Sequence, residues 1–342
     1  IASWKNGKPL GPVRIEIHPT NKCNLKCKFC WQTTVKGEVD RSTEISYENL
    51  LQIVEDAAKL NVKEWIVSGG GEPFYRGKET LGMMELIKKK KMWGQLTTNA
   101  SLLTEEYIKK IVKMGWDQVQ ISLDGPTAEV HDFIRSVPGT FKIATKAAKL
   151  FSFYRKKYMK KKPYLGFNTC ITRHVHDKMC DMIKLGKEVG FDLVFFEPVY
   201  AGYVSKHRFT LNKKETEFLE KEAKKAKELA NQINIATNAD RFIRSELIDK
   251  TSFNNVVLRE SSNVDDNLYV NAPCYQPWYL MGIKANGLAG CCSTFEKGEY
   301  IHNKSLQEVW FGDLFNKIRK DMLDRKLPNY CKKCSVVVVT DN

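Results

Sequence analysis

The chain has 342 residues, of which 42% are hydrophobic and 28% are charged, with 55 Lys and Arg against 40 Asp and Glu. This composition excludes a disordered or low-complexity protein, and no apolar run approaches the roughly 20 residues that a membrane-spanning helix needs. The net charge of +15 comes mostly from lysines in or near expected helices. Such lysines usually form solvated faces, so a nucleic-acid partner is the less favoured explanation.

The first two hundred residues alternate between short apolar runs typical of strands and amphipathic stretches typical of helices. The expected strands are Val13–Pro19, Glu64–Val67, Gln95–Asn99, Gln118–Asp124, Tyr164–Thr172 and Asp192–Val199. The expected helices are Tyr47–Leu60, Thr80–Lys91, Thr104–Met114, Thr140–Phe153 and Asp177–Val189. Six strand–helix repeats predict a parallel sheet, and since a closed barrel of this type needs eight, we expect an α/β fold with a partial (β/α)6 TIM-like barrel.

The later part of the chain has a different pattern. Leu211–Gln232 is expected to be a long charged helix, and residues 251–267 lack periodicity and are expected to form a loop. Tyr279–Ala285 is an expected strand that turns at Asn286 and Gly287, a hairpin signal, and Ser305–Leu323 has the pattern of one amphipathic helix. We therefore predict a barrel core at 1–205, a helical insert at 206–267 and a small α+β domain at 268–342.

The ten cysteines are unevenly distributed, with three inside the eight-residue segment Cys23–Cys30 and five in the last fifth of the chain. Disulfide-stabilised secreted proteins are usually smaller, so this crowding indicates metal ligation in a reducing cytoplasm. A structural zinc site needs four protein ligands, whereas a 4Fe-4S cubane held by three cysteines keeps one iron open. A zinc site with a distant fourth ligand, or three reduced cysteines in a loop, are the alternatives.

The spacing Cys23-x3-Cys27-x2-Cys30, with Phe29 before the last cysteine, resembles the signature of the radical S-adenosylmethionine (SAM) superfamily. The resemblance implies that the open iron binds the amino and carboxylate groups of SAM. One electron then cleaves the sulfonium to a 5′-deoxyadenosyl radical, which abstracts a substrate hydrogen, while the protein orients the reactants and excludes water. It also implies a reductase, flavodoxin or ferredoxin as electron donor.

Further segments match positions at which this family contacts SAM. The run Ser68–Pro73 resembles its Gly-Gly-Glu-Pro element, in which glycines admit a ligand close to the backbone and Glu72 accepts hydrogen bonds from the methionine ammonium. Arg135 is expected to pair with the methionine carboxylate. The expected cofactor contacts are Phe29, Gly70, Gly71, Glu72, Pro73, Thr98, Asn99, Ser122, Arg135, Asn168, Glu197 and Val199. A surface salt bridge for Arg135, and a cap or turn for Ser122 and Asn168, are the structural alternatives.

The C-terminal cysteines form a second pattern, in which one cysteine is followed by Gly-x4-Cys and then by Cys-x2-Cys. This pattern resembles the SPASM/Twitch extension, which implies an auxiliary 4Fe-4S cluster. The implied ligands are Cys274, Cys292, Cys331 and Cys334. A full SPASM domain has three more cysteines, and none follows Cys334 in the sequence, so we expect a single-cluster, Twitch-like domain. A zinc knuckle with the same four thiols is the alternative.

Cys291 is adjacent to one of these ligands and could replace Cys292 in that role. If it is spare, a buried cysteine usually serves as a small hydrophobic residue, although it could also donate a hydrogen atom to a substrate radical. No other residue is assigned a catalytic role.

The two expected clusters predict the reaction type. A cluster with four cysteine ligands cannot bind SAM, so we expect it to accept an electron from the substrate radical and to complete a two-electron oxidation. The protein is therefore expected to be a cytoplasmic, dehydrogenase-like radical SAM oxidoreductase. Only 22 residues precede Cys23, which favours a small molecule or short segment as substrate. The alternatives are a peptide or protein maturase and, in another class, a basic zinc-holding nucleic-acid binding protein.

Overall fold

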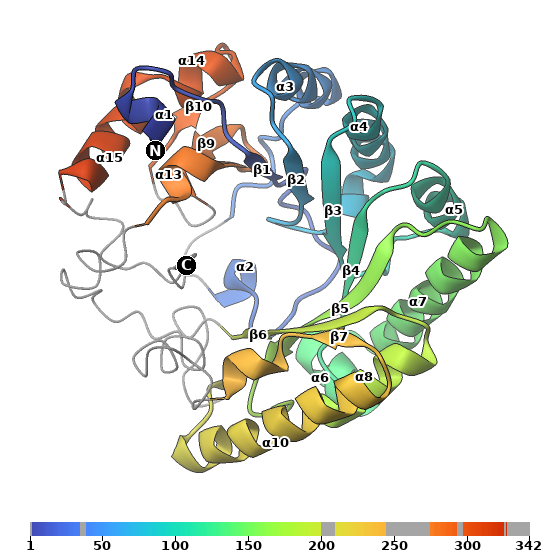
Figure 1. The fold of residues 1–342 in the computed structure, drawn as a ribbon. Coiled ribbons are helices and arrows are strands. Elements are labelled where there is room, and N and C mark those ends of the chain that lie inside the picture. The colour runs from blue at the N-terminus through green and yellow to red at the C-terminus, as the bar shows by residue number, and fades with distance from the viewer. Residues whose placement is uncertain are drawn as a thin grey trace. The chain divides into compact units, whose positions relative to one another are not determined.

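A computed structural model describes residues 2–34, 39–199, 209–243, 274–292, 297–324 and 326 (Figure 1). The described residues form two compact units. The first unit draws on Ile1–Lys22, Asp40–Gln95 and Ser261–Asn342, and the second on Cys23–Val39 and Leu96–Glu260. The expected loop at 251–267 lies outside the described residues, as do Cys331 and Cys334. The division into core, insert and C-terminal domain stays a prediction.

The first unit contains parallel strands and a C-terminal hairpin. Strand β1 (Arg14–Ile17) pairs in parallel with β2 (Glu64–Val67) on one side and with β8 (Leu280–Ile283) on the other. Strand β9 (Leu288–Gly290) runs antiparallel to β8 and to the short β10 (Glu299–Tyr300). The predicted hairpin turn is confirmed, and Gly287 has a φ of 79°, a left-handed conformation that glycine adopts without steric cost.

Seven helices accompany these strands in the described part of the first unit. They are α1 (Ala2–Lys5), α3 (Tyr47–Lys59), η1 (Pro73–Arg76), α4 (Gly77–Lys89), α13 (Gln276–Tyr279), α14 (Leu306–Trp310) and α15 (Asp313–Leu323). Ser46 caps α3 by accepting a hydrogen bond from the Asn49 amide at 3.2 Å. The expectation of one helix at Ser305–Leu323 is wrong, because the helix breaks at Gly312, where a Cβ would lie 2.6 Å from the Glu308 carbonyl oxygen.

The second unit continues the alternation of strands and helices. Strands β4 (Gln118–Ser122), β5 (Tyr164–Ile171), β6 (Leu193–Pro198) and β7 (Ala236–Thr237) pair in parallel in that order. Its helices are α2 (Trp31–Thr34), α5 (Glu105–Lys113), α6 (Ala128–Arg135), α7 (Thr140–Lys157), α8 (Met179–Glu188), α10 (Lys213–Gln232) and η3 (Ala239–Phe242). Helix α10 packs along α8 (Figure 1). Strand β3 (Trp93–Thr98) is divided between the two units.

All six expected strands are found, with ends that differ by at most two residues. Buried side chains alternate with more accessible ones along these strands, and Ile15, Trp65, Phe167 and Phe196 are fully buried. Among the described residues, no helix is both long enough and apolar enough to cross a membrane. Parallel strands of this kind place functional residues at their carboxyl ends, where the cysteine segment and the candidate SAM contacts lie along the chain.

Candidate functional site

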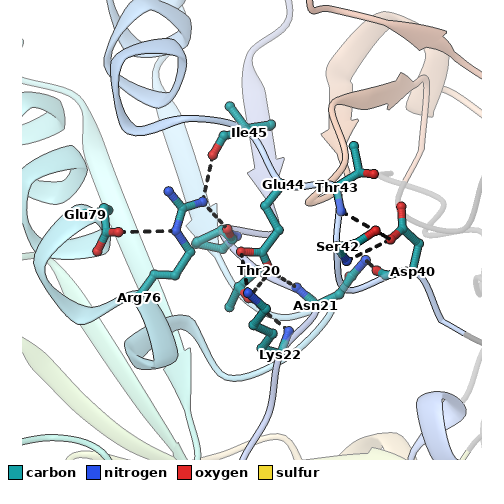
Figure 2. A network of polar contacts seen from close by, with 11 residues as sticks. Thr20, Asn21, Lys22, Asp40, Ser42, Thr43, Glu44, Ile45, Arg76 and Glu79 are labelled. Atoms are coloured by element: carbon teal, nitrogen blue, oxygen red, sulfur yellow. Dashed lines mark hydrogen bonds and ion pairs between the residues drawn. The ribbon is translucent and has the colours of Figure 1, made fainter.

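In the first unit, a polar network joins the two chain segments that flank the cysteine segment (Figure 2). Glu44 Oε1 accepts hydrogen bonds from Thr20 Oγ1 at 2.5 Å and from the Asn21 amide at 3.3 Å. Its second oxygen lies 3.8 Å from Lys22 Nζ. One carboxylate therefore holds the chain that enters the cysteine segment against the chain that leaves it.

Two further contacts complete this network (Figure 2). Asn21 Nδ2 donates to the Asp40 carbonyl at 2.8 Å, and Arg76 Nη1 donates to the Ile45 carbonyl at 2.7 Å. Asp40 Oδ1 accepts from the hydroxyl and the amide of Ser42, which together with the Thr43 groups lowers the pKa of Asp40 to about 2. Most of these bonds satisfy backbone groups, so the network is a structural clamp.

The predicted Gly-Gly-Glu-Pro element packs against the same entering chain. The Gly71 amide donates to the Thr20 carbonyl at 2.8 Å, and the Glu72 amide donates to the Lys22 carbonyl at 2.9 Å. A Cβ on Gly71 would lie 2.0 Å from the Lys22 carbonyl oxygen, and one on Gly70 would lie 2.1 Å from Asn21 Oδ1. The glycines are therefore required by a contact within the protein, whereas the sequence had suggested only the close approach of a ligand.

Glu72 is deeply buried and performs a structural task as well. Its Oε1 accepts a hydrogen bond from the Phe74 amide at 3.2 Å and thereby caps η1, which Pro73 begins. Its expected contact with the methionine ammonium stays a prediction.

The cysteine segment itself belongs to the second unit and alternates between buried and exposed residues. Leu25 and Cys27 are buried, whereas Lys26 and Lys28 are exposed. The Lys28 amide donates to the Ile134 carbonyl of α6 at 2.9 Å, which fixes the segment against that helix. The thiol of Cys27 consequently faces the protein interior.

Hydrogen-bond donors lie beside two of the three cysteine sulfurs. Arg135 Nη1 donates to Cys27 Sγ at 3.5 Å, Asn99 Nδ2 approaches Cys23 Sγ at 3.9 Å, and the Leu25 amide donates to Cys23 Sγ at 3.5 Å. The ring of Phe29 lies 5.6 Å from the Arg135 guanidinium. Such donors stabilise thiolates and are among the means by which proteins tune iron–sulfur clusters.

The thiols of Cys23, Cys27 and Cys30 are the ligands predicted for the cubane. Among the described residues, no group of three or more His, Cys, Asp or Glu side chains is close enough to hold one metal ion. In a cubane each cysteine ligates a different iron, so the sulfurs stand further apart than the ligands of one zinc. Burial, and then the neighbouring Cys27, raise the pKa of the Cys30 thiol, and a bound metal would reverse this by deprotonating its ligands.

Arg135 is held by a buried carboxylate. Its Nη2 lies 2.6 Å from Asp124 Oδ2, and both side chains are nearly inaccessible to water. Burial by itself lowers the pKa of Arg135, but the charges of Asp124 and Cys27 raise this pKa above its usual value. Burial raises the pKa of Asp124, and Arg135 opposes that effect. The structure therefore corrects the alternative of a surface salt bridge for Arg135: the pair is internal.

Two neighbours fix Asp124 in turn. Its Oδ1 accepts a hydrogen bond from the Cys170 amide at 2.9 Å, and its own amide donates to His131 Nδ1 at 3.0 Å. Burial, aided by Arg135, lowers the pKa of His131 to about 3, so the ring is neutral. Neither Asp124 nor His131 is among the cofactor contacts expected from the sequence. The sequence does contain a signal for this ion pair. Asp124 lies two residues beyond a buried strand, and Arg135 follows on the next helix.

The remaining expected SAM contacts lie on adjacent strands of the second unit. Ser122 and Asn168 are partners in the parallel register, and Asn168 Nδ2 donates to Glu197 Oε2 at 3.5 Å. Val199 packs near Phe29 in a small apolar cluster. Two buried polar atoms, Asn168 Oδ1 and Arg135 Nε, have no hydrogen-bond partner in the described part of the chain. An acceptor and a cationic donor of this kind fit a polar cofactor that also carries a carboxylate.

In the first unit, the structure describes three of the C-terminal cysteines. Cys291 is buried, whereas Cys274 and Cys292 are half-buried. The more accessible Cys292 is the one that the Gly-x4-Cys spacing favours. The ligand set of the auxiliary cluster stays a prediction, since Cys331 and Cys334 lie outside the described residues.

Nearby, Arg319 of α15 is enclosed by aromatic rings. Its guanidinium lies 4.2 Å from the ring centre of Trp4 and 4.3 Å from that of Trp310. It donates to the Trp310 carbonyl at 2.7 Å and to the Pro277 carbonyl at 2.9 Å. Burial lowers the pKa of Arg319 to about 10. This residue holds the last described helix to the first one.

Parallel strands joined by helices, with a three-cysteine segment after the first strand, define an α/β protein that binds an iron–sulfur cofactor. Family models identify it more closely. The model described as the radical SAM superfamily matches residues 17–167, and the model described as the iron-sulfur cluster-binding SPASM domain matches residues 274–335. The chain belongs to the radical SAM superfamily and carries a SPASM domain. Its cofactors are a 4Fe-4S cluster, SAM and an auxiliary iron–sulfur cluster, as predicted.

Curated relatives are similar over parts of their length. A Pyrococcus furiosus protein named as a tungsten-containing aldehyde ferredoxin oxidoreductase cofactor-modifying protein is 29% identical over 51% of this chain and 48% of its own. A GTP 3′,8-cyclase of Clostridium perfringens is 27% identical over 64% and 65%. A pre-heme d1 synthase of Dinoroseobacter shibae is 28% identical over 55% and 44%. The chain thus spans between about half and two thirds of these relatives.

Solved structures share the fold. Streptococcus suis SuiB bound to its precursor peptide SuiA has a TM-score of 0.68 at 19% identity, covering 98% of this chain and 72% of that one. Native anSMEcpe with bound AdoMet has a TM-score of 0.66 at 19% identity, covering 95% and 89%. At these identities the likeness concerns the fold alone, and it confirms the predicted class, an α/β chain with a partial (β/α)6 barrel.

Proposed function

We propose that this radical SAM enzyme cleaves SAM reductively at the cluster held by Cys23, Cys27 and Cys30, and then oxidises its substrate by two electrons. The bound cluster and SAM together supply a 5′-deoxyadenosyl radical that removes a substrate hydrogen atom. The observation that carries the proposal is the cysteine segment, which presents Cys27 to the interior beside Arg135.

The chain's own residues then bind, orient and shield the reactants. Arg135, through its Nε, and Asn168, through its Oδ1, offer buried polar groups to the methionine and nucleoside parts of SAM. Leu25 and the small apolar cluster around Phe209 exclude water beside the cysteines. Exclusion of water matters because a carbon radical would otherwise be lost to side reactions.

The SPASM domain supports the oxidative outcome. An auxiliary cluster whose irons are all ligated by cysteine cannot bind SAM, but it can accept the second electron from a substrate radical. The names of the curated relatives, which include a cyclase of GTP and a pre-heme d1 synthase, support a small molecule or cofactor as substrate. A peptide substrate, as in the complex of SuiB with its precursor peptide SuiA, is the other outcome that the experiment below distinguishes.

The test uses anaerobically reconstituted protein, reduced with dithionite and incubated with SAM and candidate substrates. We expect 5′-deoxyadenosine to form, and deuterium from a labelled substrate to appear in it together with a product oxidised by two electrons. A product at the substrate's oxidation level that carries solvent hydrogen would contradict the oxidation while leaving SAM cleavage intact. Protein that binds zinc without iron and forms no 5′-deoxyadenosine would contradict the whole proposal.

A further inference from the structure

Arg135 lies between a cluster ligand and a carboxylate with which it forms a buried ion pair. One terminal nitrogen donates to Cys27 Sγ at 3.5 Å, and the other lies 2.6 Å from Asp124 Oδ2. The Asp124 side chain is fully inaccessible, and that of Arg135 is 11% exposed. Burying two charges costs more desolvation than a fold usually regains from their attraction. A stabilising role alone therefore does not explain the pair.

Hydrogen bonds to neighbouring elements hold both members of the ion pair in place. Asp124 Oδ1 is fixed by the Cys170 amide of β5, and the Asp124 amide donates to the neutral ring of His131 on α6. Arg135 lies at the end of the same helix, whose Ile134 carbonyl accepts from the Lys28 amide. The strand, the helix and the cysteine segment thus fix the direction of the ion pair, with its positive end toward Cys27.

We propose that the Asp124–Arg135 pair sets the reduction potential of the cluster that Cys27 ligates, with Asp124 as the positioning residue for Arg135. The inference rests on the proposed function, because it requires a cluster at these cysteines. Hydrogen bonds and charges beside ligand sulfurs are general determinants of iron–sulfur potentials. Here the cation at Cys27 stabilises the reduced cluster, and the carboxylate moderates that effect while holding the cation in place.

The redox step is a transfer of one electron. An external low-potential reductant, which is a viologen mediator in the test, gives one electron to the oxidised cubane, whose core charge falls from 2+ to 1+. No covalent bond forms or breaks, and no proton moves. The protein therefore affects this step only through the charges and donors around the sulfurs.

The two members of the pair predict shifts of opposite sign. Arg135→Gln removes the cation from Cys27, so the potential becomes more negative. At the potential where half of the wild-type clusters are reduced, we expect the ratio of reduced to oxidised cluster to fall about tenfold, the size expected for one charged hydrogen bond. Asp124→Asn leaves the cation without its counter-charge, so the potential becomes more positive. A residue with only a structural role would not give opposite shifts.

Asp117→Asn is the matched control. Asp117 is also a buried acid with an ion-pair partner, Lys162, but it precedes β4, whereas Asp124 follows that strand. Seven residues of extended chain separate the two by roughly 23 Å. We expect the cluster in the Asp117→Asn variant to have the wild-type reduction potential, although the free energy of unfolding of this variant falls.

The experiment is a redox titration of the anaerobic full-length protein, followed by the EPR signal that changes when SAM is added. Opposite shifts for Arg135→Gln and Asp124→Asn support the inference, while shifts of the same sign, or none beyond the Asp117→Asn control, overturn it. If Asp124→Asn does not fold, Arg135→Lys replaces it, and its shift must be smaller than that of Arg135→Gln. A wild type that incorporates no iron contradicts the proposed function, a separate result from a titratable cluster whose variants do not shift.

Discussion

Two of the carboxylate-centred networks among the described residues, one around Glu44 and one around Asp124, differ in what the carboxylates bind. In the first unit, Glu44 and Asp40 accept mostly from backbone amides and hydroxyls, and both are at least partly accessible to water. In the second, Asp124 is fully buried and binds a cation that contacts a cysteine sulfur. The first arrangement is a low-cost clamp. The second arrangement buries two opposite charges, which adds little net stability to the fold. It also places a cation beside a predicted cluster ligand.

The largest effect is expected from breaking the buried pair. Arg135→Met removes the cation and leaves Asp124 buried without its charge partner, which should lower the free energy of unfolding by about 3–5 kcal/mol. Urea denaturation measures this loss. A change below about 1 kcal/mol would mean that the carboxylate is solvated or already protonated, and that the two networks are alike.

A smaller loss is expected from overpacking the clamp. Gly71→Ala places a methyl group against the Lys22 carbonyl oxygen, a backbone atom that cannot move without shifting the entering chain. We expect the free energy of unfolding to fall by about 1–3 kcal/mol, measured by denaturation, and the protein to retain less iron, measured by metal content. Gly115→Ala serves as a control, because a Cβ there meets nothing within 4 Å and tests only the cost of its φ of 70°. Equal losses in both variants would show that packing against Lys22 is not the cause.

Removing the acid of the clamp should cost less. Glu44→Ala leaves the Thr20 hydroxyl and the Asn21 amide without their acceptor, although water can reach part of the site. The free energy of unfolding is expected to fall by about 1–2 kcal/mol. Glu44→Gln, which keeps an acceptor oxygen, should recover most of it in the same denaturation assay. If the Gln variant is as unstable as the Ala variant, the ion pair with Lys22 carries the effect instead.

The smallest effect is a pH dependence at Asp40. Because the folded pKa is lowered to about 2, the ionised side chain stabilises the fold above its ordinary pKa of about 4. This contribution is lost as the pH falls from about 4 through about 2. The difference in melting temperature between wild type and Asp40→Asn should therefore be constant near neutral pH and shrink in that acidic range. A constant difference down to pH 2 would show that the Asp40 contacts do not depend on its charge.

Much of this architecture follows from short-range signals. The alternation of apolar runs with amphipathic stretches was sufficient for six strands, and Asn286 with Gly287 was sufficient for the hairpin turn between β8 and β9. The pairing of β8 with β1 was not predictable, since it joins residues more than 260 positions apart that no local pattern relates. The break at Gly312 was also missed, because the apolar periodicity continues across it.

The candidate site shows the same limit. Cysteine spacing indicated a cluster because all three ligands lie in one short segment. Asp124 was not given a role, because its partner Arg135 is 11 residues away and the significance of the pair depends on burial. Gly71 was assigned to ligand approach, whereas its neighbour is the Lys22 carbonyl. Residues that act through long-range contacts or burial require the folded chain to be recognised.

The central claim is that three cysteines hold a cubane with one iron open to SAM. Electron–nuclear double resonance on the reduced protein, with SAM labelled by 15N at its amino group, tests it directly. We predict a 15N coupling to the cluster signal in the wild type, and its loss in Cys27→Ala. A well-formed cluster that shows no coupling to the label, or protein that holds zinc and no iron, would contradict the claim.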